Sequence, residues 1–102
     1  MKLKEIEPQR ILYLRGVVNY TEFYFKDGKK FVSSFTLKHH QESLSHFLRV
    51  SKSHLLNPSS IKRIHYYGSE REVELNTGKR VKVSRRRRIV LESINISKKT
   101  ES

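Results

Sequence analysis

The Asp27-Gly28 pair is the sequence feature that most restricts the fold. An Asp-Gly pair favours a tight two-residue turn, because glycine readily adopts the positive φ that such turns need. A run rich in aromatic residues, Tyr20–Lys26, precedes the pair, and Phe31 and Val32 follow it. We therefore predict an antiparallel hairpin over 20–33 in which Tyr24 lies opposite Phe31.

Further runs with strand character lie on both sides of this hairpin, at 11–14, 47–50, 61–67, 72–75 and 80–83. A three-residue loop at 77–79 would set Leu75 opposite Val81 and Glu74 opposite Lys82, so both faces of this second hairpin agree on one register. We find no internal repeat in the sequence. The pattern predicts a mainly β fold built from antiparallel strands.

Two helices are predicted, one in the middle of the chain and one near its C-terminal end. Thr36 is suited to cap a short central helix that ends near His46. Ser84 is suited to cap a C-terminal helix whose first turn holds Arg85–Arg88. A single helical turn is also predicted at Asn57-Pro58, because proline is favoured at the first helical position.

The charge of the chain indicates an anionic partner. The 102 residues, enough for one domain, carry 22 Lys and Arg against 10 Asp and Glu, a formal net charge of +12. Such an excess of one sign repels itself, and a polyanion would relieve that repulsion. There is no cysteine, which excludes disulfides and thiolate metal sites and suits a reducing cytoplasm. No apolar run approaches the roughly 20 residues of a membrane span.

The basic residues are densest in Lys79–Arg88, where seven of ten positions are Lys or Arg. If Ser84 begins a helix, the arginines lie at the helix end that already carries partial positive charge. That placement is reasonable where an anion binds, because helix N-termini and arginine both bind phosphate. A solvated basic surface without a ligand is the alternative.

Signals for an enzyme are weak. No nucleotide-binding or nucleophile motif is present, and the histidines, which are His39, His40, His46, His54 and His65, match no metal-ligand spacing. We expect no catalytic residue, no metal and no cofactor. Two alternatives stay open: a small basic nuclease using His54 with Glu72 or Glu74, and a non-specific polyanion- or RNA-binding protein.

Several segments, in order and with the right gaps, resemble one family. They are Ile11-Leu12-Tyr13-Leu14, Asn19-Tyr20-Thr21, Asp27-Gly28-Lys29, the run from Phe47 to Asn57, Gly78-Lys79 and Val83-Ser84-Arg85-Arg86. Together they resemble the LytTR DNA-binding domain over residues 10–94, leaving 1–9 as an N-terminal tail or edge strand and 95–102 as a polar tail. One departure is Ser51, where the family usually has His.

The resemblance implies an elongated fold of small antiparallel sheets and a cytoplasmic bacterial transcription regulator. It implies sequence-specific binding of double-stranded DNA by three loops that enter the major groove, with Arg85 as the candidate for a guanine. It further implies promoter direct repeats as the target, a homodimer on DNA and a regulatory protein partner. The candidate DNA-binding residues are Asn19, Tyr20, Thr21, Ser51, Lys52, Ser53, His54, Ser84, Arg85, Arg86 and Arg87.

Overall fold

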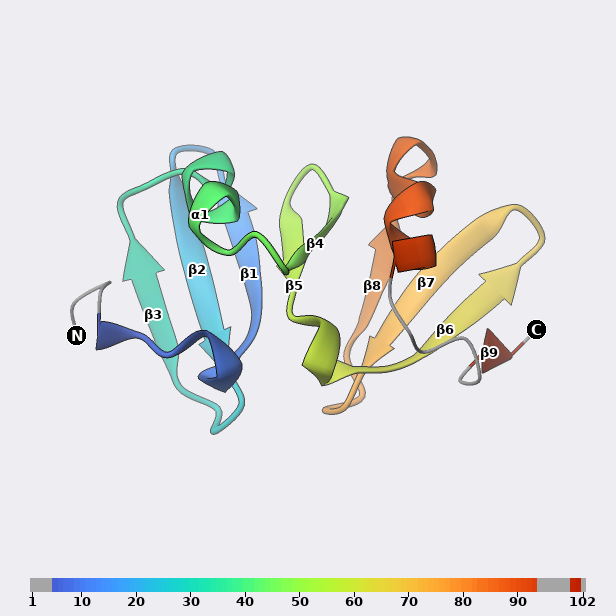
Figure 1. Cartoon of the computed structure of the whole chain (residues 1–102), viewed down its shortest axis with the longest axis horizontal. Helices are drawn as coiled ribbons and strands as arrows, with labels where there is room; N and C mark the ends of the chain where they lie inside the picture. The colour runs from blue at the N-terminus through green and yellow to red at the C-terminus, as the bar shows by residue number, and fades with distance from the viewer. Residues whose placement is uncertain (1–4, 94–99, 102) are drawn as a thin grey trace.

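The computed structural model of the chain describes residues 5–93 and 100–101, and it contains two β-sheets side by side (Figure 1). The five-stranded sheet has the order β3 (Lys30–Ser33), β2 (Tyr20–Phe25), β1 (Ile11–Val17), β5 (His54–Leu56), β4 (Leu48–Ser51). The four-stranded sheet has the order β8 (Arg80–Val83), β7 (Glu70–Leu75), β6 (Ile61–Tyr67), β9 (Thr100–Glu101). All pairings are antiparallel except β6 with β9.

Four helical segments complete the described chain: η2 (Pro8–Arg10), α1 (Leu37–Ser43), η3 (Pro58–Ser60) and η4 (Arg85–Ser93), of which only α1 is an α-helix. The molecule measures 40 × 25 × 20 Å. The prediction of an elongated, mainly β fold with a central and a C-terminal helix is therefore confirmed. Described residues 5–10 contain a 3-10 turn and no strand, and residues 95–99 and 102 of the expected polar tail lie outside the described residues.

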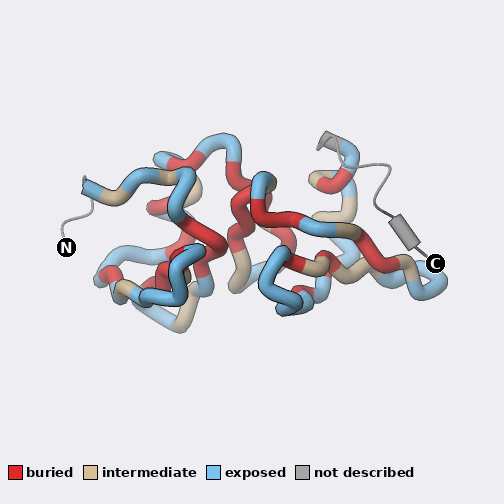
Figure 2. The backbone as a smooth tube through the Cα atoms, turned by 90° about the horizontal axis from the view of Figure 1, so that it is seen from below, coloured by how far each residue is buried: buried red, intermediate tan, exposed pale blue. Residues whose placement is uncertain are grey.

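The five-stranded sheet is buried on both faces, which divides the apolar core into two parts. One part lies between the two sheets and η4 and includes Val50, Val73 and Leu91. The other lies between the five-stranded sheet and α1 and includes Phe23 and Leu37. Figure 2 shows this as buried chain through the middle of the molecule and exposed chain at the turns. Because both faces are covered, the run 11–14 can be apolar at every position.

The central helix is shorter than predicted. Thr36 caps it as expected, since its hydroxyl accepts a hydrogen bond of 3.3 Å from the backbone N–H of His39. The helix nevertheless ends at Ser43 and not near His46, because Leu44 leaves the helical conformation with φ −104° and ψ 62°. Leu44 is thereby buried against the five-stranded sheet.

Both predicted hairpins form, but neither predicted register is right. In the first, Phe23 pairs with Phe31 and Tyr24 with Lys30, one residue from the expected register. In the second, Val73 and not Leu75 pairs with Val81, a shift of two residues that leaves every side chain on its expected face. The cause is the same in both: the N–H of Phe25 donates to the carbonyl of Lys29 and the N–H of Leu75 to that of Lys79. Each loop therefore has three residues, 26–28 and 76–78, and contains a glycine with φ above +90°.

The chain contains a structural repeat, so the expectation of none was wrong. From η2 to β3, each element begins and ends 50 residues before its counterpart between η3 and β8. Backbone conformation repeats as well: Val18 and Gly68 have φ of 46° and 61°, and Gly28 and Gly78 have φ of 92° and 94°. Few residues are identical at this offset, whereas buried apolar positions recur in the strands, so comparing residue identities does not reveal the repeat.

The burial of His40 predicts how the stability of the fold depends on pH. His40 is a residue of α1, 5 % exposed, whose ring packs against Phe23 with Nε2 2.8 Å from the Ser33 hydroxyl. Burial, and secondarily the neighbouring His39, lowers the pKa of His40 from 6.5 to about 4. The unfolded chain then binds a proton at higher pH than the folded chain, so this contribution to stability is complete above pH 6.5 and is lost as the pH falls towards 4.

Between pH 6.5 and 4 we expect the melting temperature of the wild type to fall by roughly 5–10 °C more than that of a His40→Gln variant. Thermal melts of both proteins from pH 7.5 to 4 measure the difference, and an NMR titration of the imidazole measures the pKa directly. Parallel pH profiles, or a His40 titration near 6.5, would contradict the prediction.

Candidate nucleic-acid interface

Three loops lie along one long edge of the molecule, the upper edge in Figure 1: the β1–β2 turn, the β4–β5 turn and the β8–η4 junction. Backbone hydrogen bonds fix their spacing. The N–H of Gly16, at the end of β1, donates to the carbonyl of Ser53 at 2.8 Å. The N–H of Ser84 donates to the carbonyl of Val50, also at 2.8 Å. The second loop is thus tied to both of the others.

The first loop exposes two of its three predicted residues. Asn19 and Tyr20 are exposed, whereas Thr21 is fully buried and its hydroxyl donates to the carbonyl of Phe35 at 2.8 Å. The side chain of Thr21 is therefore not accessible to a ligand. Val18, at the tip, is 90 % exposed with φ 46°, which is strained for a β-branched residue. Backbone strain of this kind gathers at functional sites.

The second loop presents Lys52 to solvent and holds a polar cluster beneath it. The hydroxyls of Ser51 and Ser53 lie 3.1 and 3.2 Å from Nδ1 of His54. Burial, and then the positive charges of Lys79 and Arg15, lowers the pKa of His54. The neutral ring is thus favoured, so His54 supplies a polar contact more readily than a positive charge.

The third loop carries the arginines of the basic segment. Arg85 and Arg86 are exposed and Arg87 is partly exposed, and none of the three contacts a carboxylate within the described residues. Arg88 instead donates to the carbonyls of Arg85 and Ser69. The predicted side-chain cap does not form: the hydroxyl of Ser84 is buried without a partner among described atoms. Its carbonyl accepts from the N–H of Arg87 at 3.0 Å, consistent with a 3-10 helix.

A hollow of about 440 Å³ joins the second and third loops. Ser53 and His54 line one side, and Ser84 and Arg85 line the other. The structure thus brings predicted residues that are 30 positions apart in the sequence to the walls of one concave surface.

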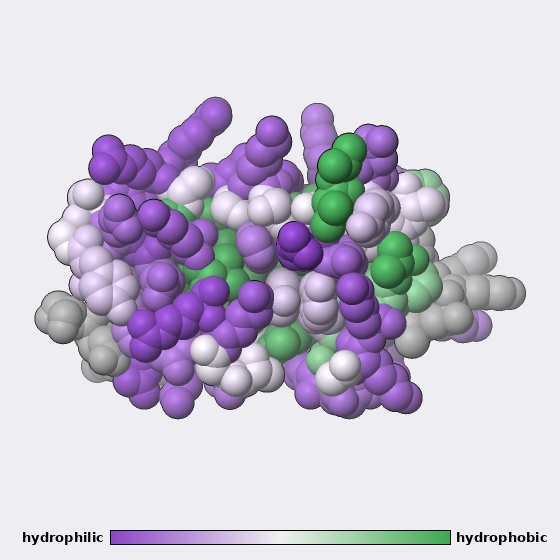
Figure 3. Space-filling model, turned by 180° about the vertical axis from the view of Figure 1, so that it is seen from behind, coloured by the Kyte–Doolittle hydropathy of each residue, from purple (hydrophilic) through white to green (hydrophobic). Residues whose placement is uncertain are grey.

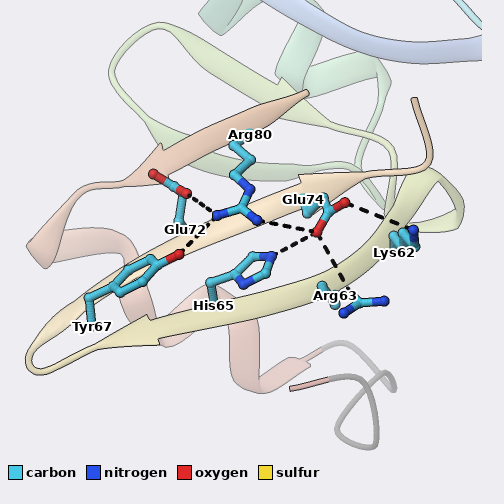
Figure 4. A network of polar contacts seen from close by, with 7 residues as sticks. All are labelled: Lys62, Arg63, His65, Tyr67, Glu72, Glu74 and Arg80. Atoms are coloured by element: carbon cyan, nitrogen blue, oxygen red, sulfur yellow. Dashed lines mark hydrogen bonds and ion pairs between the residues drawn. The ribbon is translucent and has the colours of Figure 1, made fainter. Parts of the chain in front are cut away.

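One carboxylate, that of Glu70, also lines this hollow and is paired with Lys82 at 3.3 Å, whereas Glu22 and Glu74 lie within the two sheets. Glu74 accepts from Nε2 of His65 at 2.7 Å and lies within 4 Å of Lys62, Arg63 and Arg80 (Figure 4). The His65 hydrogen bond is the main reason that the pKa of Glu74 is lowered. Glu22 makes a similar set of contacts in the five-stranded sheet, with Arg15 at 3.2 Å and Lys30 at 3.0 Å.

The cations of the sheets and those of the loops therefore differ in their partners. The lysines and arginines of the sheets are largely neutralised by neighbouring glutamates, whereas those of the second and third loops are not. Long hydrophilic side chains project from the upper edge of the molecule in Figure 3. The unpaired cations of the second and third loops attract an anion to this edge.

The family model of the LytTr DNA-binding domain matches residues 1–94. The chain belongs to the LytTR family. It is accordingly a DNA-binding domain of the kind found in bacterial transcription regulators. The match includes residues 1–9, which the sequence analysis set apart as a tail or edge strand.

A solved structure supports this LytTR fold. The chain is similar to the LytTr DNA-binding domain of a putative methyl-accepting/DNA response regulator from Bacillus cereus. The two share 20 % identity with a TM-score of 0.77, and the alignment covers 86 % of this chain and 83 % of the other. A search of curated proteins gave no significant match.

The described residues contain no group of three or more His, Cys, Asp or Glu that could hold a metal ion. No helix in the described part of the chain is long and apolar enough to cross a membrane. Arg49 lies within the run from Phe47 to Asn57 that resembles the family, but its place beneath the second loop was not predicted. An arginine between two buried apolar residues of a strand was the available signal.

Proposed function

We propose that this LytTR domain recognises a specific double-stranded DNA sequence through its three aligned loops and thereby regulates transcription. The observation that carries the proposal is the position of Lys52, Arg85 and Arg86: they are exposed on neighbouring loops and have no carboxylate partner among the described residues. These cations lie on one edge of a molecule that is 40 Å long. One turn of B-DNA is about 34–36 Å, so such an edge is long enough to meet two successive major grooves on one face of a duplex.

The loops have different roles in this proposal. Arg85 donates two hydrogen bonds to a guanine at one end of the site. Lys52 contacts phosphate in the middle, and Asn19 and Tyr20 contact a base edge or phosphate at the other end. Phosphate contacts position the protein and base contacts supply specificity. Thr21 has no role in binding, because its side chain is buried.

Selection of bound sequences from random duplex at physiological salt tests the proposal. We expect one short motif to be enriched, and footprinting to show protection of major-groove positions about one helical turn apart. Enrichment of unrelated sequences, with equal affinity for heparin and any duplex, would favour the polyanion-binding alternative.

The nuclease alternative needs His54 close to Glu72 or Glu74. In the structure His54 contacts the serines of the second loop, whereas Glu74 is bound to His65 and Glu72 to Arg80. We infer no catalytic role from this arrangement. Incubating the protein with labelled DNA and RNA, with and without a divalent metal, tests the alternative directly, and cleavage would revive it.

The remaining elements of the proposal concern assembly. Direct repeats in a promoter would place two copies of the domain on one face of the duplex, as a homodimer on DNA. A regulatory protein partner and a cytoplasmic location belong to the same proposal. Measuring the stoichiometry on duplexes with one or two copies of the selected motif tests the dimer.

A further inference from the structure

Arg49, on β4, turns its guanidinium towards the second loop. Nε donates to the carbonyl of Ser51 at 2.9 Å and Nη2 donates to the carbonyl of Lys52 at 2.5 Å. Nη1 donates to Oε1 of Gln41, on α1, at 2.6 Å. All three nitrogens of the group are thus used within the protein, and the side chain is only partly exposed.

The loop needs such a support because its strand pairing is irregular. Leu48 and Arg49 pair with Leu56 and Leu55, but the register then shifts, and Ser51 pairs with His54. A bulge of this kind disrupts the regular ladder and re-aims the chain beyond it. The Arg49 guanidinium fixes the direction of two successive carbonyls, those of Ser51 and Lys52, beyond this shift.

Gln41 holds the other side of the guanidinium. Its helix, α1, is packed on the five-stranded sheet through Leu37 and Leu44. The second loop is therefore braced through Arg49 against an element that is itself fixed by the core. Rigid support of this kind is what a binding loop needs to keep its contacts in register.

Arg49 also lies where the second and third loops meet. Burial, and then the charge of Arg87, lowers the pKa of Arg49. Arginine nevertheless stays protonated in proteins. Two like charges are therefore close together in the free protein, and a phosphate bound at this edge would relieve their repulsion.

We infer that Arg49 is a positioning residue for DNA recognition: it sets the shape of the loop that presents Lys52 and does not itself contact DNA. This inference rests on the proposed function. Lysine retains the charge at this position but not the planar fork, so it cannot bridge the same three acceptors. The substitution Arg49→Lys therefore separates geometry from charge.

We expect Arg49→Lys to weaken binding to the selected duplex by roughly tenfold, the value of about one well-made base contact. Binding to a scrambled duplex should change by less than about twofold, with the same salt dependence, because phosphate contacts dominate non-specific binding. In the free protein, the amides of 51–53 should exchange with solvent faster than in the wild type. Arg10→Lys is the matched control, since Arg10 is exposed and paired with Asp27 at 3.5 Å.

Three outcomes would overturn the inference: unchanged binding in Arg49→Lys, equal losses on both duplexes, or unchanged amide exchange at 51–53. A loss of salt dependence in Arg49→Gln that Arg49→Lys restores would identify a phosphate contact instead.

Gln41→Ala removes a single hydrogen bond to the Arg49 guanidinium and should lower the preference for the selected duplex by about threefold, so the test holds even if Arg49→Lys does not fold. A wild type that does not discriminate between duplexes would refute the proposed function, whereas the amide-exchange result needs no DNA.

Discussion

Raising the salt concentration from 50 to 200 mM is expected to weaken DNA binding by about 10³–10⁵-fold. The reason is that each phosphate neutralised by a lysine or arginine releases a condensed counterion, and the release becomes less favourable as salt rises. Lys52 and Arg85–Arg88 have no carboxylate partner in the described part of the chain. Arg15 and Lys82 are paired but keep 49 % and 70 % of their side chains exposed. These residues supply the six or more contacts that the expected dependence requires.

Affinity for one duplex, measured by fluorescence anisotropy at five or more salt concentrations, gives the slope. Arg10→Ala provides a control, because Arg10 lies at the opposite edge of the sheet and is paired with Asp27, so the slope should stay unchanged. Arg86→Ala should reduce the slope by about one. A wild-type slope near zero would mean that the exposed arginines do not meet phosphates.

Replacing Arg85 by alanine is expected to weaken binding to the selected duplex by about 1–3 kcal/mol and to relax the preference at one base position. Arg85 is exposed, has no carboxylate partner among the described residues and lines the hollow between the second and third loops. In the proposed contact, the Arg85 guanidinium donates two hydrogen bonds, to O6 and N7 of a guanine, and the alanine variant loses both. Binding to a scrambled duplex should weaken much less, so the specificity ratio falls.

Lys38→Ala is the matched control for Arg85→Ala. Lys38 is an exposed cation on α1 and belongs to none of the three loops, so its removal should be nearly silent. A selection experiment repeated with Arg85→Ala identifies the base position that loses its preference. Equal losses from both variants would mean that positive charge acts only diffusely and that the third loop reads no base.

The sequence determined the type and order of most elements, because the local signals were strong. Thr36 caps a helix, Asn57 and Pro58 begin a helical turn, and Gly28 and Gly78 make the hairpin turns. Loop length was harder to predict. The Asp-Gly signal for a two-residue turn gave way to a three-residue loop, 26–28, in which Phe25 N–H donates to Lys29 O and Gly28 N–H donates to Phe25 O. Each loop then set the register of its hairpin.

The candidate site divides in the same way. The arginines of the third loop were visible in the sequence as a basic segment, and their contact with DNA stays a prediction. The burial of Thr21 was not visible, because a threonine in an alternating strand can face either side. The 50-residue repeat was also hidden, since it is carried by apolar positions and turn conformations more than by identical residues.

By itself the sequence determined that this chain is a cysteine-free, basic, mainly β domain of the LytTR family with an excess of cations near its C-terminal end. Only the tertiary structure decided which of those cations are neutralised, which loops share an edge and which residue braces the second loop. The physical reason is distance: hairpins and caps depend on residues a few positions apart. The contacts of Glu22 with Lys30, of Gln41 with Arg49 and of Val50 with Ser84 join separate elements and exist only once the chain has folded.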